Sequence, residues 1–196
     1  MRGVAALVFA IAAGGCSGGG SLGPAEFTFQ EGFEGGLTEW RSGFELPEDP
    51  NNPGHVVAWS IDPSALEAAE GSWSARYVLD GSQDDGTIWL ERAFDMEPGA
   101  SYRVDVRLKL WSETESFNIL AAVAVFAGAA PPVTESQFDV SKQANLAAGW
   151  HLYSYTLQAA ADSIGRLWIA VGITALWETP LEYFLDDLVV ELRRTG

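Results

Sequence analysis

Residues 100–111, ASYRVDVRLKLW, decide the fold of this chain, because apolar and polar side chains alternate along the whole stretch. Successive side chains of a β-strand point to opposite faces of a sheet, so this alternation predicts a half-buried strand. A helix would scatter both kinds of side chain around its axis. Glu97-Pro98-Gly99 directly before the stretch is a turn signal, since proline presets φ and glycine accepts a positive φ. The apolar face consists of Tyr102, Val104, Val106, Leu108 and Leu110.

Short segments of the same kind occur along most of the remaining chain, and turn-forming residues separate them. We expect these strands at residues 26–34, 55–61, 71–79, 87–94, 118–127, 150–158, 166–174 and 183–192. The one helical turn that we expect is at residues 64–69, after an Asp62-Pro63 cap. Many short strands with almost no helix predict an all-β fold, a two-sheet antiparallel jelly-roll β-sandwich over residues 26–193. The absence of a repeat disfavours a propeller or a solenoid.

The composition indicates one soluble, exported domain that follows a targeting segment. The chain has 196 residues, 47% of them hydrophobic, which is enough to bury a core. Its formal net charge is −16, and phosphate backbones and anionic lipid surfaces repel such a protein. Nucleic acid is therefore not an expected partner. Cys16 is the only cysteine, so no internal disulfide can form and the fold must be held by packing, or by packing and a metal.

Residues 1–16 have the pattern of a signal peptide. Arg2 precedes an apolar run at residues 4–13, which is too short for a membrane-spanning helix of about 20 residues. Ala13-Gly14-Gly15-Cys16 resembles the bacterial lipobox, in which the cysteine becomes the lipidated first residue. That pattern usually has leucine three places before the cysteine, where this chain has Ala13. The alternative is ordinary signal-peptidase cleavage, with Cys16 incidental.

Residues 17–25 are rich in glycine and serine and are expected to form a flexible linker. If Cys16 is lipidated, the resemblance implies an exported protein that is anchored in the cell envelope, at the outer membrane where the cell has one. Stable anchoring by several acyl chains follows from about 0.8 kcal/mol per buried CH₂ group. Membrane contact would then occur through the lipid anchor alone.

Two carboxylates fall on apolar strand faces. Glu31 shares the register of Phe27, Phe29 and Phe33, and Asp186 shares that of Phe184 and Leu188. An isolated buried carboxylate is costly, so each must be paired, protonated or bound to metal. Calcium prefers carboxylate and carbonyl oxygens. We therefore expect a structural calcium site with ligands from Asp186, Glu31 or Glu34, and carbonyl groups near Gly32 and Gly71. The alternative is that the carboxylates lie at strand ends in water or meet an arginine.

Five segments of the chain resemble the landmarks of jelly-roll carbohydrate-binding modules and of the wider galactose-binding-domain-like group. They are Phe33-Glu34-Gly35-Gly36 followed by Trp40, then Glu70-Gly71-Ser72-Trp73-Ser74-Ala75, Glu97-Pro98-Gly99-Ala100-Ser101-Tyr102, Gly149-Trp150 and Phe184-Leu185-Asp186-Asp187-Leu188. The resemblance covers about residues 26–193. It implies a β-sandwich with a structural calcium held by Asp186 and the carbonyl group near Gly71. The sugar-binding residues of the family vary too much to be assigned here.

Three of the eight tryptophans, Trp89, Trp111 and Trp168, fall on polar strand faces. Indole rings stack on the C–H faces of sugars, while arginine and aspartate bind hydroxyl groups. We therefore expect these rings to form one glycan-binding face with Arg103, Asp105 and Arg107. Two alternatives remain open. Long loops such as residues 45–54 would cover the rings as a second small core, or the face would bind a protein.

The sequence contains no recognisable catalytic motif. A jelly-roll hydrolase or lyase stays open as an alternative, because a pair of catalytic carboxylates can be neither shown nor excluded in an acidic sequence. His55 has no recognisable serine or cysteine partner, and His151 shares a face with two tyrosines. There is no phosphate loop, zinc spacing or dinucleotide motif. The sequence therefore predicts a non-catalytic carbohydrate-binding lipoprotein that holds glycan on the cell envelope. The alternative is an envelope adhesion or assembly domain that binds protein through the same face.

Overall fold

The computed structural model describes residues 26–48, 52–82 and 85–195. The predicted signal peptide, Cys16 and the linker lie outside these residues. Within the described residues the chain forms eleven strands and one short 3₁₀ helix, η1 (Glu135–Gln137). The strands are β1 (Glu26–Glu31), β2 (Arg41–Glu45), β3 (Trp59–Ser64), β4 (Ser74–Leu79), β5 (Gly86–Asp95), β6 (Ser101–Ser112), β7 (Ala121–Gly128), β8 (Asp139–Gln143), β9 (Gly149–Ala160), β10 (Arg166–Ala175) and β11 (Leu181–Arg194). No helix of this part of the chain is long and apolar enough to cross a membrane.

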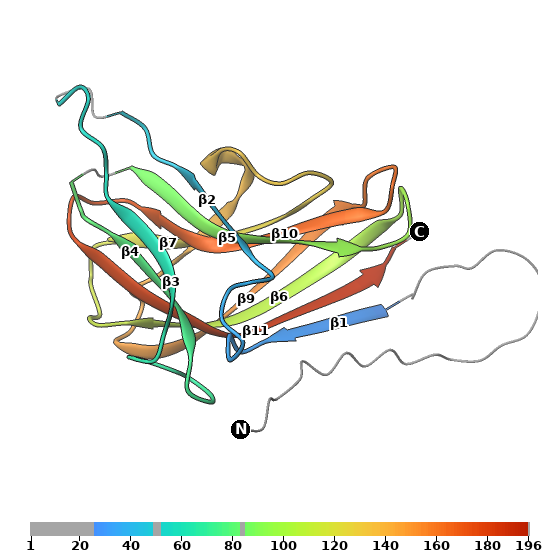
Figure 1. Ribbon diagram of the computed structural model, residues 1–196, viewed down its shortest axis with the longest axis horizontal. Helices are drawn as coiled ribbons and strands as arrows, with labels where there is room; N and C mark the ends of the chain where they lie inside the picture. The colour runs from blue at the N-terminus through green and yellow to red at the C-terminus, as the bar shows by residue number, and fades with distance from the viewer. Residues whose placement is uncertain (1–25, 49–51, 83–84, 196) are drawn as a thin grey trace, which may run out of the picture.

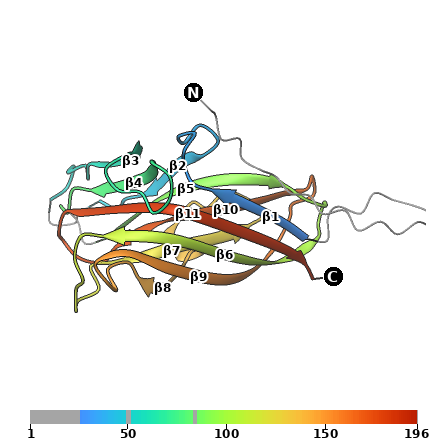
Figure 2. The same ribbon diagram turned by 90° about the horizontal axis from the view of Figure 1, so that it is seen from below.

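The strands form two antiparallel sheets that pack face to face (Figures 1 and 2). The six-stranded sheet has the order β3-β4-β11-β6-β9, and β1 also pairs with β11. The five-stranded sheet has the order β2-β5-β10-β7-β8. The long strand β11 meets β4 along its first half and β1 along its second half. The predicted two-sheet antiparallel β-sandwich is confirmed.

The core lies between the two sheets and follows the alternation of each strand. The apolar face of β6 predicted from the sequence is buried, and Val123, Val125, Ile169 and Val171 of the other sheet face it. Each fully buried aliphatic side chain of this kind stabilises the fold by about 1.5–3 kcal/mol. Hydrogen bonds also join the sheets, since the hydroxyl of Tyr77 on β4 donates to the carbonyl oxygen of Val171 on β10 over 3.0 Å.

Two local predictions are wrong. Residues 64–69 do not form a helical turn, because β3 continues through Asp62 and Pro63 to Ser64. The proline is tolerated there because β3 is an edge strand.

The second wrong prediction concerns the first half of β11, where Phe184 and Asp186 were expected to face the core. The pairing register of β11 with β6 shifts between Asp186 and Val189, and Asp187 adopts a φ of 49°. Such a bulge moves the preceding side chains to the other face. Leu185 therefore packs in the core. Phe184 and Asp186 lie on the outer face of the six-stranded sheet, opposite Trp111 and Lys109 of β6.

Candidate functional site

The six residues predicted to bind a glycan lie on two different sheets. Trp89 on β5 and Trp168 on β10 lie on the outer face of the five-stranded sheet. The other four, Trp111, Arg103, Asp105 and Arg107, lie on β6 and face outward from the six-stranded sheet. The prediction of one shared surface is therefore wrong. Alternation along a strand tells which side of its sheet a residue occupies, but it does not tell which sheet contains the strand.

The Trp89 ring forms part of a second, smaller hydrophobic cluster outside the five-stranded sheet. Small residues make room for it, because a Cβ atom on Gly43 would lie 2.3 Å from Trp89 Cε2. Phe138 covers the ring at a centroid distance of 5.1 Å, and only 2% of Trp89 is exposed. Phe138 ends residues 129–138, which connect β7 to β8 and which we call the strap. For Trp89 the alternative expectation is therefore correct: the ring belongs to a second small core, and the strap covers it.

The strap is attached to the sheet through Glu135 of η1. A carboxylate oxygen of Glu135 accepts a hydrogen bond from the Thr87 hydroxyl over 2.8 Å, and its backbone N–H donates to the Glu45 carboxylate. Burial, together with the negative charges of Asp85 and Glu45, raises the pKa of the Glu135 carboxyl. When Glu135 is ionised, its carboxylate is therefore repelled by those of Asp85 and Glu45 at the point where the strap meets the sheet.

A groove of about 300 Å³ runs between the strap and strand β2. It is lined by Arg41, Ser42, Gly43, Phe44, Trp89, Glu91, Pro131, Pro132 and Val133. Phe44 and Val133 are exposed by 55% and 69%, so both walls of the groove carry an accessible apolar side chain. Exposed apolar surface among polar groups is typical of a binding site.

Arg41 is the basic residue among the side chains that line this groove. Its Nε donates to Glu91 Oε1 over 3.0 Å, and its Nη2 donates to the same oxygen. The other oxygen of Glu91 accepts from the indole N–H of Trp89 over 2.9 Å. The guanidinium carbon lies 5.0 Å from the centroid of the Trp168 ring, within the range of a cation–π contact. Arg41 is thus held on two sides, while 65% of its side chain stays exposed.

The outer face of the six-stranded sheet offers a different arrangement. Trp111 pairs directly with Trp150 of β9, and Phe184 contacts Trp111 edge-to-face at a centroid distance of 5.3 Å. Both tryptophans are half-buried. Trp150 and Phe184 were not predicted as site residues. Alternation along β9 could have identified Trp150, because it falls on the strand face opposite to that of His151, Tyr153 and Tyr155.

The charged residues of this face are largely paired with one another. Arg103 donates to Asp105 and holds the pKa of the Asp105 carboxyl below its ordinary value, with help from the Thr156 hydroxyl and Arg193. Arg107 pairs with Glu191 over 2.7 Å. The side chains of Arg103 and Arg107 are also less exposed than that of Arg41, at 49% and 51% against 65%.

The residues predicted to bind calcium lie near one another, and backbone N–H groups satisfy their carboxylates. Glu31 accepts from the Phe33 N–H over 2.9 Å and from the Trp40 indole over 3.1 Å. Glu34 accepts from the N–H groups of residues 72 and 73. Gly71 is needed beside Glu34, since a Cβ atom there would lie 2.3 Å from Glu34 Oε1.

Asp186 is fully buried and accepts from the N–H groups of Ala69, Glu70 and Asp187 over 2.7–3.0 Å. Burial raises the pKa of its carboxyl, and the N–H groups oppose that shift. N–H groups facing a carboxylate do not fit a bound cation, and the described residues contain no group of three metal-ligating side chains. The calcium site stays a prediction that this arrangement does not favour.

No protein-family model and no curated protein matches the chain. Solved structures do resemble it. A carbohydrate-binding module of the β-sandwich superfamily, studied for its promiscuous specificity, is 13% identical with a TM-score of 0.45, and the match covers 85% of this chain and 61% of that one. A xylan-binding domain of carbohydrate-binding module family 22 is 14% identical with a TM-score of 0.46, over 86% of this chain and 96% of that one.

An arabinose-bound α-L-arabinofuranosidase is 9% identical with a TM-score of 0.50, over 80% of this chain. This chain spans 61% of the first of these proteins and 23% of the arabinofuranosidase. At such identities the likeness concerns the fold alone. The chain is therefore structurally similar to β-sandwich carbohydrate-binding modules, and its function must be argued from its own surface.

Proposed function

We propose that this protein is a non-catalytic glycan-binding domain and that the glycan lies in the groove between β2 and the strap. The observation that carries the proposal is the fixed position of Arg41. Glu91 and Trp168 hold its guanidinium group, while most of the side chain faces solvent. A preorganised donor loses little entropy when it binds a hydroxyl or carboxylate group.

The apolar parts of the groove suit the remaining surface of a sugar. Phe44, Val133 and the prolines of the strap present apolar surface to either side of Arg41. Sugar rings present C–H groups to such surfaces and hydroxyl groups to charged side chains. The groove is open, which suits several units of a polysaccharide chain.

Retention in affinity electrophoresis through gels that contain single polysaccharides tests this proposal. We expect Trp168→Ala and Arg41→Lys each to weaken the retention of the wild type about tenfold or more, which corresponds to about 1.4 kcal/mol. Lysine keeps a positive charge beside Glu91 but lacks the planar guanidinium group. The matched control is Trp111→Ala on the other sheet, which should leave retention unchanged. Loss of retention in the Trp111→Ala variant alone contradicts the proposal.

We also propose that the domain is held on the cell envelope by a lipid on Cys16. The sequence supports this proposal, because Ala13-Gly14-Gly15-Cys16 resembles a lipobox and a glycine- and serine-rich segment follows it. Metabolic labelling with a radioactive fatty acid tests the anchor, and labelling that persists in Cys16→Ser contradicts it.

A protein-binding adhesion or assembly domain is the second candidate function. It is favoured by large apolar side chains that are exposed on the molecule, among them Phe117, Leu152 and Trp177 with exposures of 103%, 57% and 56%. Exposed large apolar side chains mark a protein interface where they gather into one patch. If no polysaccharide retains the wild type, this second function is favoured over glycan binding.

A further inference from the structure

Three loops meet at the end of the sandwich where β6 and β10 end (Figures 1 and 2). They connect β6 to β7, β8 to β9 and β10 to β11, and they comprise residues 113–120, 144–148 and 176–180. Backbone hydrogen bonds join them. The Ser116 N–H donates to the carbonyl oxygen of Asn145 over 3.2 Å, and the Leu176 N–H donates to that of Leu120 over 2.9 Å. The three loops therefore form one surface, which we call the loop end.

The loop end buries a polar side chain and exposes apolar ones. Asn145 is only 1% exposed, and its side chain accepts from the Leu120 N–H over 3.3 Å and donates to the carbonyl oxygen of Asn118 over 3.2 Å. The large apolar side chains that are exposed instead are those of Phe117, Ile119, Leu146, Leu176 and Trp177. Hydrophobic burial within the domain does not explain this arrangement, whereas a partner that covers these side chains does.

Further hydrogen bonds fix the loops in place. The Gln143 side chain donates to the carbonyl oxygen of Ser116 over 2.8 Å, and the Ser112 hydroxyl donates to that of Thr114 over 2.8 Å. A surface that is already ordered loses little conformational entropy when a partner binds. The exposed apolar side chains are therefore presented on a preorganised base.

The charge of the loop end selects the kind of partner. The three loops contain Glu113, Glu115 and Glu178 but no lysine or arginine. Two proteins that bind one another carry complementary charges, and like charges that face each other are unfavourable. A second copy of this chain or an anionic bilayer would bring negative charge against these glutamates. Charge complementarity therefore favours a partner protein with basic side chains around an apolar surface.

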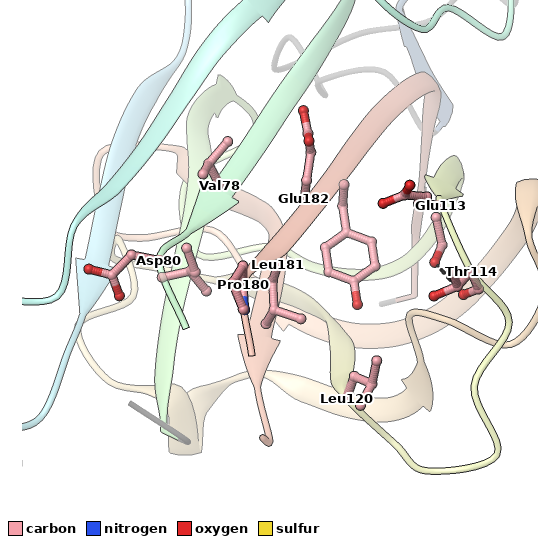
Figure 3. A pocket seen from close by; sticks show the side chains of 11 residues that line it. Val78, Asp80, Glu113, Thr114, Leu120, Pro180, Leu181 and Glu182 are labelled. Carbon is pink, nitrogen blue, oxygen red and sulfur yellow. Dashed lines mark hydrogen bonds between the residues drawn. The ribbon is translucent and has the colours of Figure 1, made fainter. Parts of the chain in front are cut away.

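A cavity of about 290 Å³ lies beside these loops (Figure 3). Leu120 and Pro180 of the loop end line it together with Leu79 of β4 and Leu181 of β11. The centre of a protein interface often contains an apolar side chain that fills a pocket of the partner. The cavity gives room for one such side chain next to the exposed ones.

We propose that the loop end binds a basic, amphipathic segment of a partner protein. The apolar side chains of that segment cover Phe117 and Trp177, and its lysine or arginine side chains face the three glutamates. This site shares no residue with the groove between β2 and the strap. The proposal therefore goes beyond glycan binding and does not depend on it.

An NMR titration of the ¹⁵N-labelled protein with a synthetic amphipathic peptide of leucine and lysine tests the proposal. The control is the same peptide with glutamate in place of each lysine. We expect the lysine peptide to shift the resonances of residues 113–120 and 176–180 and to bind about tenfold more tightly than the glutamate peptide, or better. Binding should weaken severalfold when the salt concentration is raised.

Four variants complete the test. Phe117→Ser and Trp177→Ser should each weaken binding of the lysine peptide about fivefold or more, while thermal melts verify that both are folded. Ile164→Ser is the matched control, because it removes an exposed apolar side chain from the turn between β9 and β10, at the other end of β10. It should bind like the wild type. Trp168→Ala should also bind the peptide normally, so failure of the loop end and failure of the groove are distinguishable.

Other occupants of the loop end would give other results, and each of these overturns the proposal. Cosedimentation with vesicles of dioleoylphosphatidylcholine that is lost in Phe117→Ser would indicate a lipid surface. A dimer in sedimentation velocity that Phe117→Ser dissociates would indicate a second copy of the chain. A lysine peptide that shifts none of the loop-end resonances, or that Ile164→Ser weakens as much as Phe117→Ser does, would show that the loop end is no specific site.

Discussion

Asp186 shows how single residues hold this fold together. Its buried carboxylate accepts three backbone N–H hydrogen bonds, two of them from the loop that covers it. The substitution Asp186→Ala leaves these donors without an acceptor, and each unsatisfied group costs about 1–3 kcal/mol. We expect urea unfolding to show a loss of about 3 kcal/mol or more. Asp187→Asn tolerates the same backbone conformation and removes an exposed ion pair with Lys109, so it should cost less than about 1 kcal/mol.

The same N–H groups lead us to expect that EDTA leaves the melting temperature of the wild type unchanged. A rise of several degrees with added calcium would contradict this expectation and would support the predicted calcium site. Asp186 and Glu31 lie on neighbouring strands, as predicted, since β1 pairs with β11. Alternation does not show that N–H groups satisfy both carboxylates, because most of those donors come from loops.

For individual site residues, local alternation predicts the face of the strand on which a side chain lies, but not what covers that side chain. The outward direction of Trp89 follows from its neighbours, but its burial depends on Phe138, which lies far along the chain and packs against it. Arg41 has no local signal at all, because Glu91 and Trp168, which fix its position, are distant in sequence. Long-range partners decide whether an outward-facing ring is covered or free.

The strap is the element whose stability depends most clearly on pH. Because the pKa of Glu135 is raised, this carboxyl favours the folded state below its unfolded pKa, and that contribution is lost as pH rises through its folded pKa. Glu135→Gln keeps an oxygen that accepts from Thr87 and removes the repulsion with Asp85 and Glu45. We expect its melting temperature at pH 7 to exceed that of the wild type by up to about 3 °C.

This difference in melting temperature should shrink as the pH falls toward 4, which thermal melts across the pH range can measure. Ser136→Ala, in the same 3₁₀ helix, is the control and should show no such pH-dependent difference. If the difference in melting temperature for Glu135→Gln grows at acidic pH, the pKa of Glu135 is not raised in the folded protein.

Strand β11 shows why some elements were placed on the wrong side of their sheet. A count of odd and even positions assumes a regular strand, and the bulge at Asp186 and Asp187 inserts one residue that breaks the count. The left-handed conformation of Asp187 has no distinct signature in the sequence, since aspartate occurs there without being required. The strands before and after the bulge were nevertheless predicted, because each half alternates.

At the scale of the whole molecule, the two-sheet sandwich was predictable because nearly every segment has a period of two. The distribution of strands between the sheets was not predictable, because it depends on pairings such as β1 with β11 that span most of the chain. This distribution separates Trp111 from Trp89 and Trp168 and places two possible binding faces on opposite sides of the molecule.

The central claim is that a glycan binds over the five-stranded sheet, and the indole N–H resonances of the tryptophans test it most directly. A ¹H–¹⁵N spectrum is recorded while an oligosaccharide of the retained polysaccharide is added. We predict that the indole signal of Trp168 shifts progressively, while those of Trp111 and Trp150 stay in place. A titration in which Trp111 and Trp150 shift and Trp168 does not would contradict the account.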